Sequence, residues 1–214
     1  MDVNVNGSLN VLKSCKNCNI SKFIVISSAT VYGQGIEIKP HNENPPTNPI
    51  LVYEKSKLEM ENEVKEFSRI SNLDLIIFRL FNVYEEGQSD VYTGVIKKFV
   101  NRVRQNKPVI IYGKGDQTRD FIHVINVIEY IIRAIKNIRG KKGEIYNIGT
   151  EKIISIKQLV IDIFSIFEKN FVINYAESLE GDIKCISTKI DKSEKMLDYS
   201  SKIRLKNGIA RTFF

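Results

Sequence analysis

The chain has 214 residues, 43% of them hydrophobic, and a formal net charge of +7. This length can bury a sizeable core as one domain or one and a half. No apolar run approaches the roughly 18 residues of a membrane helix, and the first residues do not form a signal peptide, so we expect a cytoplasmic protein. The lysines are scattered, which favours a generally basic surface over a nucleic-acid groove.

The predicted elements alternate between helices and strands, which indicates an α/β fold with parallel strands. We expect helices over residues 3–17, 53–68, 93–105 and 126–137, and strands over 23–27, 75–80, 109–112 and 144–148. Prolines at positions 45, 46 and 49 predict a loop that ends before Tyr53. Ser155 and Gln158 form a capping-box pattern that opens a further helix. The glycines at 33 and 35 and at 113 and 115 indicate turns.

Three cysteines and no export signal argue for reduced thiols. Cys15 and Cys18 have the spacing of a metal or redox pair, but a structural zinc needs four ligands. The other soft candidates, Cys185, His41 and His123, lack finger-like spacing. We therefore assign no metal site, expect the cysteine pair to pack at the end of the first helix, and interpret His123 as a core residue without a role.

Tyr53 and Lys57 form a Y-x-x-x-K pattern twenty-five residues after Ser28. On a helix this spacing places the phenol and the ammonium on one face, with Cβ atoms about 5–6 Å apart. A fixed cation nearby favours the charged phenolate, so Lys57 would make Tyr53 a usable base near neutral pH. Ser28 would supply a hydroxyl that orients the substrate. The pattern alone also fits an ordinary solvated, lysine-rich helix.

Further motifs follow in a fixed order, at residues 4–12, 23–33, 78–84, 113–121, 146–149 and 181–183. With Tyr53 and Lys57, they resemble the extended short-chain dehydrogenase/reductases of the NAD-dependent epimerase/dehydratase family, and above all the UDP-glucose 4-epimerases. The resemblance implies a partial Rossmann-like, doubly wound parallel sheet with a small interleaved C-terminal α/β lobe. Residues 1–82 and 108–150 would belong to the NAD-binding domain, and residues 83–107 and 151–214 to the nucleotide-sugar-binding lobe.

The resemblance also implies roles for single residues. Ser28, Tyr53 and Lys57 would be catalytic and would contact NAD together with Phe81. The substrate would contact the side chains of Asn82, Arg119 and Lys184. Alternatively, Asn82 is a turn residue after a strand, and Arg119 forms an ion pair with Asp116 or Asp120. Three positions depart from the family pattern: Leu179 replaces a second phosphate-binding arginine, Asn126 replaces an aspartate, and Glu85-Glu86 replaces Gly-Pro.

The Gly-rich turn that holds the NAD pyrophosphate in this family has no counterpart in the sequence. The resemblance therefore implies an N-terminally truncated epimerase that is inactive alone. The alternative is a non-catalytic remnant that binds a nucleotide sugar or a partner chain. Ala29-Thr30 cannot protonate a leaving hydroxyl as a dehydratase requires, so we expect epimerisation of a UDP-hexose.

The truncation has a consequence for the sheet. The strand at 23–26 would lack its usual neighbour and become an apolar edge, which tends to recruit other strands. We therefore expect self-association, or dependence on a chain that supplies the missing half. Full-length relatives often dimerise through the helices that correspond here to residues 3–17 and 53–68, so a homodimer is a further expectation.

Overall fold

The computed structural model describes residues 2–33, 42–44, 46–88, 94–168, 171–179, 183–185, 187 and 189–213. A π-helical turn at Asp2–Asn6 leads into the first helix, and a 3-10 turn at Ala29–Tyr32 follows the first strand. The helices are α1 (Gly7–Asn17), α2 (Val52–Ile70), α3 (Val95–Arg104), α4 (Val124–Asn137), α5 (Ile156–Ile166), α6 (Asp191–Leu197) and α7 (Leu205–Phe213). The strands are β1 (Lys22–Ser28), β2 (Asp74–Leu80), β3 (Asn82–Tyr84), β4 (Val109–Tyr112), β5 (Thr118–His123), β6 (Lys142–Ile148), β7 (Ile153–Ser155) and β8 (Ile173–Ala176).

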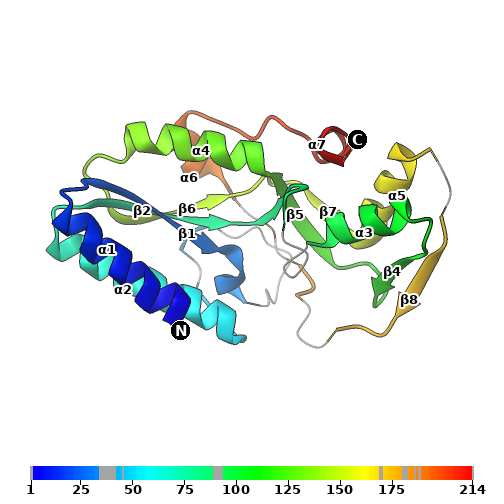
Figure 1. Ribbon diagram of the computed structural model, residues 1–214, viewed down its shortest axis with the longest axis horizontal. Helices are drawn as coiled ribbons and strands as arrows, with labels where there is room; N and C mark the ends of the chain where they lie inside the picture. The colour runs from blue at the N-terminus through cyan, green and yellow to red at the C-terminus, as the bar shows by residue number, and fades with distance from the viewer. Residues whose placement is uncertain are drawn as a thin grey trace.

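The main sheet has the order β1-β2-β6, and its strands run parallel. The central strand β2 is apolar on both faces, because helices cover both sides of the sheet. Helices α1 and α2 pack on one face, and α4 and α6 pack on the other (Figure 1). The sheet therefore separates two apolar cores, and its carboxyl edge points toward the rest of the molecule.

A third core lies at the other end of the molecule, among α3, α5, α7 and β4 (Figure 1). Strand β4 pairs in parallel with β8. A separate sheet, β3-β5-β7, lies between this core and the main sheet, because β3 follows β2 after a single residue and β5 leads directly into α4. Strand β5 pairs in parallel with β3 and antiparallel with β7, so this small sheet is mixed. The parallel main sheet with helices on both faces confirms the predicted α/β class.

The predicted elements on the main sheet are present with small shifts at their ends. Helix α4 begins two residues earlier than expected, because the Nδ1 atom of His123 accepts the N–H of Ile125 at 3.1 Å and caps the helix. The Ser155 hydroxyl accepts the N–H of Gln158 at 3.1 Å, as the capping pattern predicted. A strand was expected around residues 121–124, and β5 ends there at His123. Strands β3, β7 and β8 and helices α6 and α7 were not predicted as elements.

Glycine is required at the turn that follows the 3-10 segment. Gly33 has a φ of 71°, and a Cβ atom there would lie 1.9 Å from the carbonyl oxygen of Asn48. Gly113 and Gly115 also have positive φ, which confirms the second glycine-based turn. Gly35 lies outside the described residues.

All three cysteines are free thiols. Cys18 caps the end of α1 as expected, but it is exposed rather than packed. Within the described ranges, no cluster of three or more His, Cys, Asp or Glu side chains could hold a metal ion. No helix in the same ranges is long and apolar enough to cross a membrane.

Candidate functional site

The start of α2 is fixed by a carboxylate immediately beside Tyr53. Glu54 accepts the backbone N–H groups of Ile50 and Leu51 at 2.7 and 3.0 Å. Tyr53 is therefore in the first turn of the helix, where its side chain is 51% exposed. The Lys57 amine lies 6.0 Å from the centre of the Tyr53 ring. The predicted pair thus shares one helical face.

Lys57 contacts the outer edge of the main sheet. Its Nζ atom donates to the carbonyl oxygen of Ile26 at 3.0 Å. Burial lowers the pKa of Lys57, and the Glu61 carboxylate one turn further along α2 opposes this decrease. Ile26 precedes Ser28 by two residues, so the amine lies between the tyrosine and the end of β1.

Ser28 ends β1 and caps the 3-10 turn. Its Oγ atom accepts from the backbone N–H of Thr30 at 3.3 Å and from the Thr30 hydroxyl at 3.0 Å. The hydrogen of the Ser28 hydroxyl can therefore still be donated to a ligand. Residues of α2 contact the 3-10 turn, so Ser28, Tyr53 and Lys57 belong to one region of the molecule.

Phe81 and Asn82 connect this region to the neighbouring sheet. Phe81 is buried and packs with Ala29 and Tyr32 of the 3-10 turn, and Ile183 packs against this group. The Asn82 amide donates to the carbonyl oxygen of Asp120 at 3.0 Å. In the structure Asn82 begins β3 and pairs with β5, so it is a strand residue and not only a turn residue.

Arg119 lies on β5 and donates to the backbone carbonyl of Ile183. The next residue of the segment, Lys184, accepts the N–H of Thr118 at its carbonyl, and its side chain is exposed. The carboxylate of Asp120, one of the two ion-pair partners considered for Arg119, is buried and accepts hydrogen bonds from Thr150 and Glu151. Arg119 of β5 and Lys184 therefore lie on neighbouring segments of the chain.

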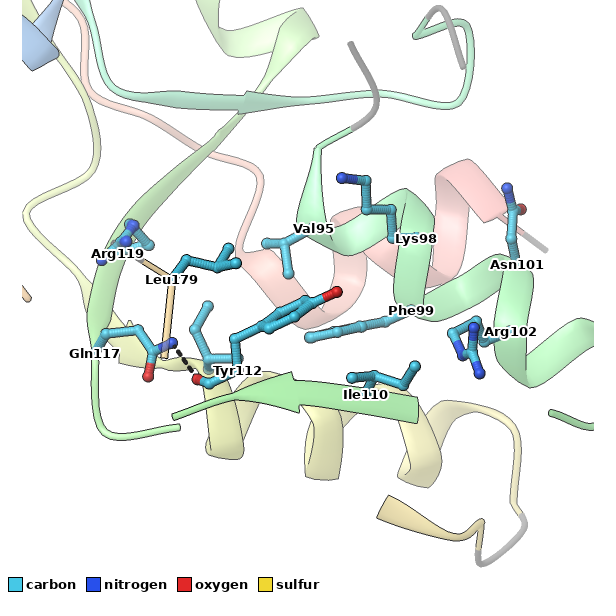
Figure 2. A pocket seen from close by; sticks show the side chains of 11 residues that line it. Val95, Lys98, Phe99, Asn101, Arg102, Ile110, Tyr112, Gln117, Arg119 and Leu179 are labelled. Atoms are coloured by element: carbon cyan, nitrogen blue, oxygen red, sulfur yellow. Dashed lines mark hydrogen bonds between the residues drawn. The ribbon is translucent and has the colours of Figure 1, made fainter. Parts of the chain in front are cut away.

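A cavity of about 560 Å³ opens beside Arg119, between α3 and β4 (Figure 2). Its volume lies within the range of small-molecule sites. Its walls are mainly apolar and aromatic, and a few cationic and amide groups lie at its rim. The lining residues are Val95, Lys98, Phe99, Asn101, Arg102, Ile110, Tyr112, Gln117, Arg119, Ile156 and Leu179. Ser28, Tyr53, Lys57 and Lys184 do not line it.

Contacts join the two regions through Phe81. Phe81 packs on the turn after Ser28, and Ile183, which packs on Phe81, accepts a hydrogen bond from Arg119. Leu179 is 55% exposed at the cavity wall, where the family pattern suggested a cation. The apolar cavity and the turn after Ser28 are therefore linked by the contacts of Arg119, Ile183 and Phe81.

Sequence reasoning missed a buried polar group beneath the tyrosine and lysine. The Glu61 carboxylate binds Arg79 in a two-point ion pair, and it also accepts the Ser27 hydroxyl at 2.6 Å. The Arg79 guanidinium lies 4.8 Å from the centre of the Tyr32 ring, and the Tyr32 hydroxyl donates to Asn147 at 2.7 Å. An arginine inside the apolar run of β2 was the available signal, because such a charge needs a buried partner.

The departure at Asn126 also has a structural explanation. Asn126 is buried, and its amide oxygen accepts from the Tyr199 hydroxyl at 3.0 Å and from the N–H of Lys202 at 3.2 Å. The side chain therefore holds the segment after α6 against α4. At the Glu85-Glu86 departure, Glu86 forms a surface ion pair with Arg104 at 3.2 Å.

A model of the NAD dependent epimerase/dehydratase family matches residues 1–149. A protein of Methanocaldococcus jannaschii, provisionally named UDP-glucose 4-epimerase, is 35% identical over 98% of this chain and 68% of its own length. Human dTDP-D-glucose 4,6-dehydratase is 30% identical over 98% of this chain and 60% of its own length.

Solved structures agree with the sequence matches. The UDP-glucose 4-epimerase of Thermotoga maritima, solved with UDP-glucose, has a TM-score of 0.91 at 26% identity, over 99% of this chain and 68% of that one. The UDP-glucuronic acid 4-epimerase of Bacillus cereus, solved with UDP-glucuronic acid and NAD, has a TM-score of 0.90 at 27% identity, over 98% of this chain and 66% of that one. The chain thus spans 60% to 68% of the length of these four relatives. The resemblance seen in the motifs is confirmed, and the chain belongs to the NAD-dependent epimerase/dehydratase family.

Proposed function

We propose that this chain carries the proton-transfer and nucleotide-sugar-binding residues of a UDP-hexose 4-epimerase. The observation that carries this proposal is the placement of the Lys57 amine between Tyr53 and the end of β1, where Ser28 caps the following turn. A phenol, an ammonium and a hydroxyl at the carboxyl end of a parallel strand suit the transfer of a proton from a sugar hydroxyl.

The described residues suit the nicotinamide half of NAD but not its pyrophosphate. Tyr53 and Lys57 offer hydrogen-bonding groups at the open edge of the sheet, and Phe81 lies near the turn that follows Ser28. The sequence holds no Gly-rich turn for the pyrophosphate. We propose that Ser28, Tyr53, Lys57 and Phe81 would contact the nicotinamide half of the cofactor, which supplies a hydride acceptor when bound.

In the proposed reaction the side chains of the chain hold and move one proton. The Lys57 ammonium favours the phenolate form of Tyr53, which takes the proton from the C4 hydroxyl of the sugar and becomes a neutral phenol. The Ser28 hydroxyl donates a hydrogen bond to the same sugar oxygen. The proton returns from Tyr53 when the sugar is reduced from its other face, so the tyrosine is restored at the end of the cycle.

The turn after Ser28 favours epimerisation over dehydration. Ala29 has no group that transfers a proton, and the Thr30 hydroxyl donates to Ser28. A dehydratase needs an acid to expel the sugar hydroxyl, and neither residue is an acid at neutral pH.

We propose that the cavity beside Arg119 holds the nucleotide, with its apolar walls around the uracil and Arg119 on the diphosphate. A guanidinium matches phosphate oxygens with two parallel hydrogen bonds. Asn82, near Arg119 on the adjoining strand, and Lys184 would contact the remaining polar groups of the UDP-hexose. In this proposal residues 1–82 and 108–150 form the part that meets NAD, and residues 83–107 and 151–214 form the part that meets the sugar nucleotide.

Arg119 provides a direct test by calorimetric titration with UDP and UDP-glucose. Arg119→Ala should weaken UDP binding by about tenfold or more, because a charged hydrogen bond is lost. Arg139→Ala, which changes an exposed arginine beyond α4, should leave UDP binding unchanged. If the wild-type chain does not bind UDP, the proposed nucleotide site is wrong.

Turnover is tested by following the conversion of UDP-glucose to UDP-galactose with added NAD. We expect none from the 214 residues by themselves, because the pyrophosphate of NAD has no Gly-rich turn to bind. Turnover by this chain alone would contradict that expectation. UDP binding without turnover in any assembly would favour the alternative of a non-catalytic nucleotide-sugar-binding protein.

We also propose that the open edge of β1 is covered by an additional strand with an attached helix. Among the described residues, β1 pairs only with β2. Helix α4 lies beside this edge, and four of its isoleucines are between 37% and 49% exposed, at Ile125, Ile128, Ile132 and Ile135. Their helical spacing places them on one flank.

The contacts on the opposite flank of α4 show which way the isoleucine flank faces. Tyr130 packs edge-on against Tyr199, and Arg133 donates to the carbonyl of Leu197, so this side of α4 faces α6. Helix α6 contacts β6, the strand at the far side of the sheet from β1. The isoleucine flank therefore faces the β1 side, where a helix on an added strand would bury it.

Without such a unit, we expect the isolated chain to self-associate through the open edge of β1 and the isoleucine flank of α4. Uncovered strand edges and exposed apolar surfaces both favour association. Light scattering should show a concentration-dependent mass for the wild type. The double variant Ile128→Lys/Ile132→Lys should shift the equilibrium toward monomer. A stable monomer of the wild-type chain would contradict this part of the proposal. If the chain instead forms a symmetric dimer through α1 and α2, the double variant should have the same mass as the wild type.

A further inference from the structure

A buried polar row crosses the main sheet directly below the proposed proton-transfer residues. Ser27 on β1 is in register with Arg79 on β2, which is in register with Asn147 on β6. In-register residues on parallel strands point to the same face, so all three side chains lie on the face that α2 covers. Glu61 of α2 meets this row, because it accepts from both Ser27 and Arg79.

The ion pair within this row is fully enclosed. Glu61 is 0% exposed and Arg79 is 2% exposed. The Nε atom of Arg79 donates to one carboxylate oxygen at 3.0 Å, and a terminal nitrogen donates to the other at 2.7 Å. Two parallel bonds of this kind fix the relative orientation of the two groups.

Apart from the Lys57 hydrogen bond to Ile26, the contact between α2 and the sheet is mainly apolar. Met60 and Val64 of α2 pack in one core with Val25, Leu75 and Ile77 of the sheet. Apolar contact is not directional, so it fixes the rotation of the helix and its position along its axis less sharply than two parallel hydrogen bonds do. Glu61 is one turn after Lys57 and two turns after Tyr53, so any shift of α2 would move all three together.

We propose that Glu61 and Arg79 are positioning residues, whose ion pair sets α2 on the sheet and so holds the Lys57 amine at the Ile26 carbonyl beside Tyr53. The inference rests on the proposed function only for its effect on turnover. The placement of Lys57 itself can be measured without NAD or sugar.

If the ion pair only stabilised the fold, its removal would lower the stability of the protein and leave the Lys57 amine in place in the molecules that stay folded. Replacement of a buried ion pair by apolar side chains of similar size is often neutral or stabilising. The triple variant Ser27→Ala/Glu61→Leu/Arg79→Met removes the pair and the hydroxyl that donates to it, so it leaves no charge of the pair uncompensated. It should stay folded and lose the placement of Lys57. The single variant Glu61→Gln is nearly isosteric but leaves the Arg79 charge without its partner, so it should be less stable than the triple variant and, at temperatures where it is folded, show the same loss of the Lys57 placement.

The measurement is NMR of the lysine ammonium groups at mildly acidic pH, with the Lys57 signal assigned by its absence in Lys57→Arg. In the wild type the hydrogen bond to Ile26 should protect these protons from exchange with water. In the triple variant and in Glu61→Gln their exchange should accelerate by about tenfold, the factor that one lost charged hydrogen bond represents. Nuclear Overhauser contacts between the Tyr53 ring and Lys57 should weaken in the same variants.

Glu66→Gln is the matched control, because it removes the exposed ion pair with Arg69 on the same helix. Its Lys57 signal should equal that of the wild type. An unchanged Lys57 signal in folded Glu61→Gln would overturn the proposal. Loss of folding in the triple variant would overturn it as well, because the pair would then serve stability.

The effect on catalysis is a separate readout. In an assembly that turns over UDP-glucose, Glu61→Gln should lower kcat by about a hundredfold and leave KM unchanged, since small displacements of reacting groups have effects of this size. If no assembly of the wild type turns over, the proposed function fails, and the NMR result still decides the placement of Lys57.

Discussion

Asp120 should be the most sensitive single position in the connection between the two parts of the molecule. Its carboxylate is 0% exposed. It accepts the N–H of Thr150 at 3.0 and 3.1 Å, the Thr150 hydroxyl at 2.6 Å and the N–H of Glu151 at 3.0 Å. These bonds hold the segment after β6 against β5, next to Arg119. We therefore predict that Asp120→Ala strongly destabilises the protein.

The magnitude follows from these bonds. A hydrogen bond to a charged group contributes about 1.5–3 kcal/mol, and a donor left buried without a partner costs about 1–3 kcal/mol. The three donors share one acceptor group, so their effects do not add fully. Loss of a partner from a buried charged network typically costs about 3–5 kcal/mol, and we expect a decrease of this size in the free energy of unfolding.

Urea denaturation followed by circular dichroism provides the measurement. With a slope of about 2–3 kcal/mol per molar urea, the midpoint should fall by about 1–2 M. Asp116→Ala is the control, because Asp116 is an exposed aspartate four residues earlier on the same segment. Its effect should stay within about 0.5 kcal/mol. Equal stability of the two variants would refute the assignment of Asp120 as an anchor.

Two further predictions concern the turn after Ser28 and the end of β5. Gly33→Ala should lower the free energy of unfolding by about 1–3 kcal/mol more than Gly140→Ala, because both residues have positive φ but only Gly33 would place a Cβ against Asn48. Urea midpoints compare the two, and equal losses would mean that the turn adjusts. Burial lowers the pKa of His123 below its ordinary value of 6.5, so the unfolded chain binds a proton more readily. The stability that the neutral imidazole provides should be complete above pH 6.5 and decrease as the pH falls through that value toward the folded pKa. His123→Asn should flatten this part of the pH profile of thermal unfolding. An unchanged profile would mean that His123 does not cause the loss of stability at low pH.

The order of the elements on the main sheet could be predicted because each one has a local signal. The continuous apolar run of β2 and the spacing of Met60 and Val64 on α2 indicate which surfaces are buried. The helix cap at Ser155 is likewise a matter of adjacent residues. Strand β8 and helix α6 were missed, because their residues are partly exposed or the element is short, and the pattern that marks burial is weak there.

The candidate site was predicted in its residue types, and its geometry was not. The sequence alone determined that Tyr53 and Lys57 share a helical face, since four-residue spacing fixes this locally. Which carbonyl receives the Lys57 amine, and which buried pair holds the helix in place, depended on strands far apart in the chain. Glu61 and Arg79 are 18 positions apart and meet only because α2 packs on β2. Local periodicity is encoded by neighbours in sequence, whereas the partner of a buried charge is selected by packing, and only the tertiary structure could decide it.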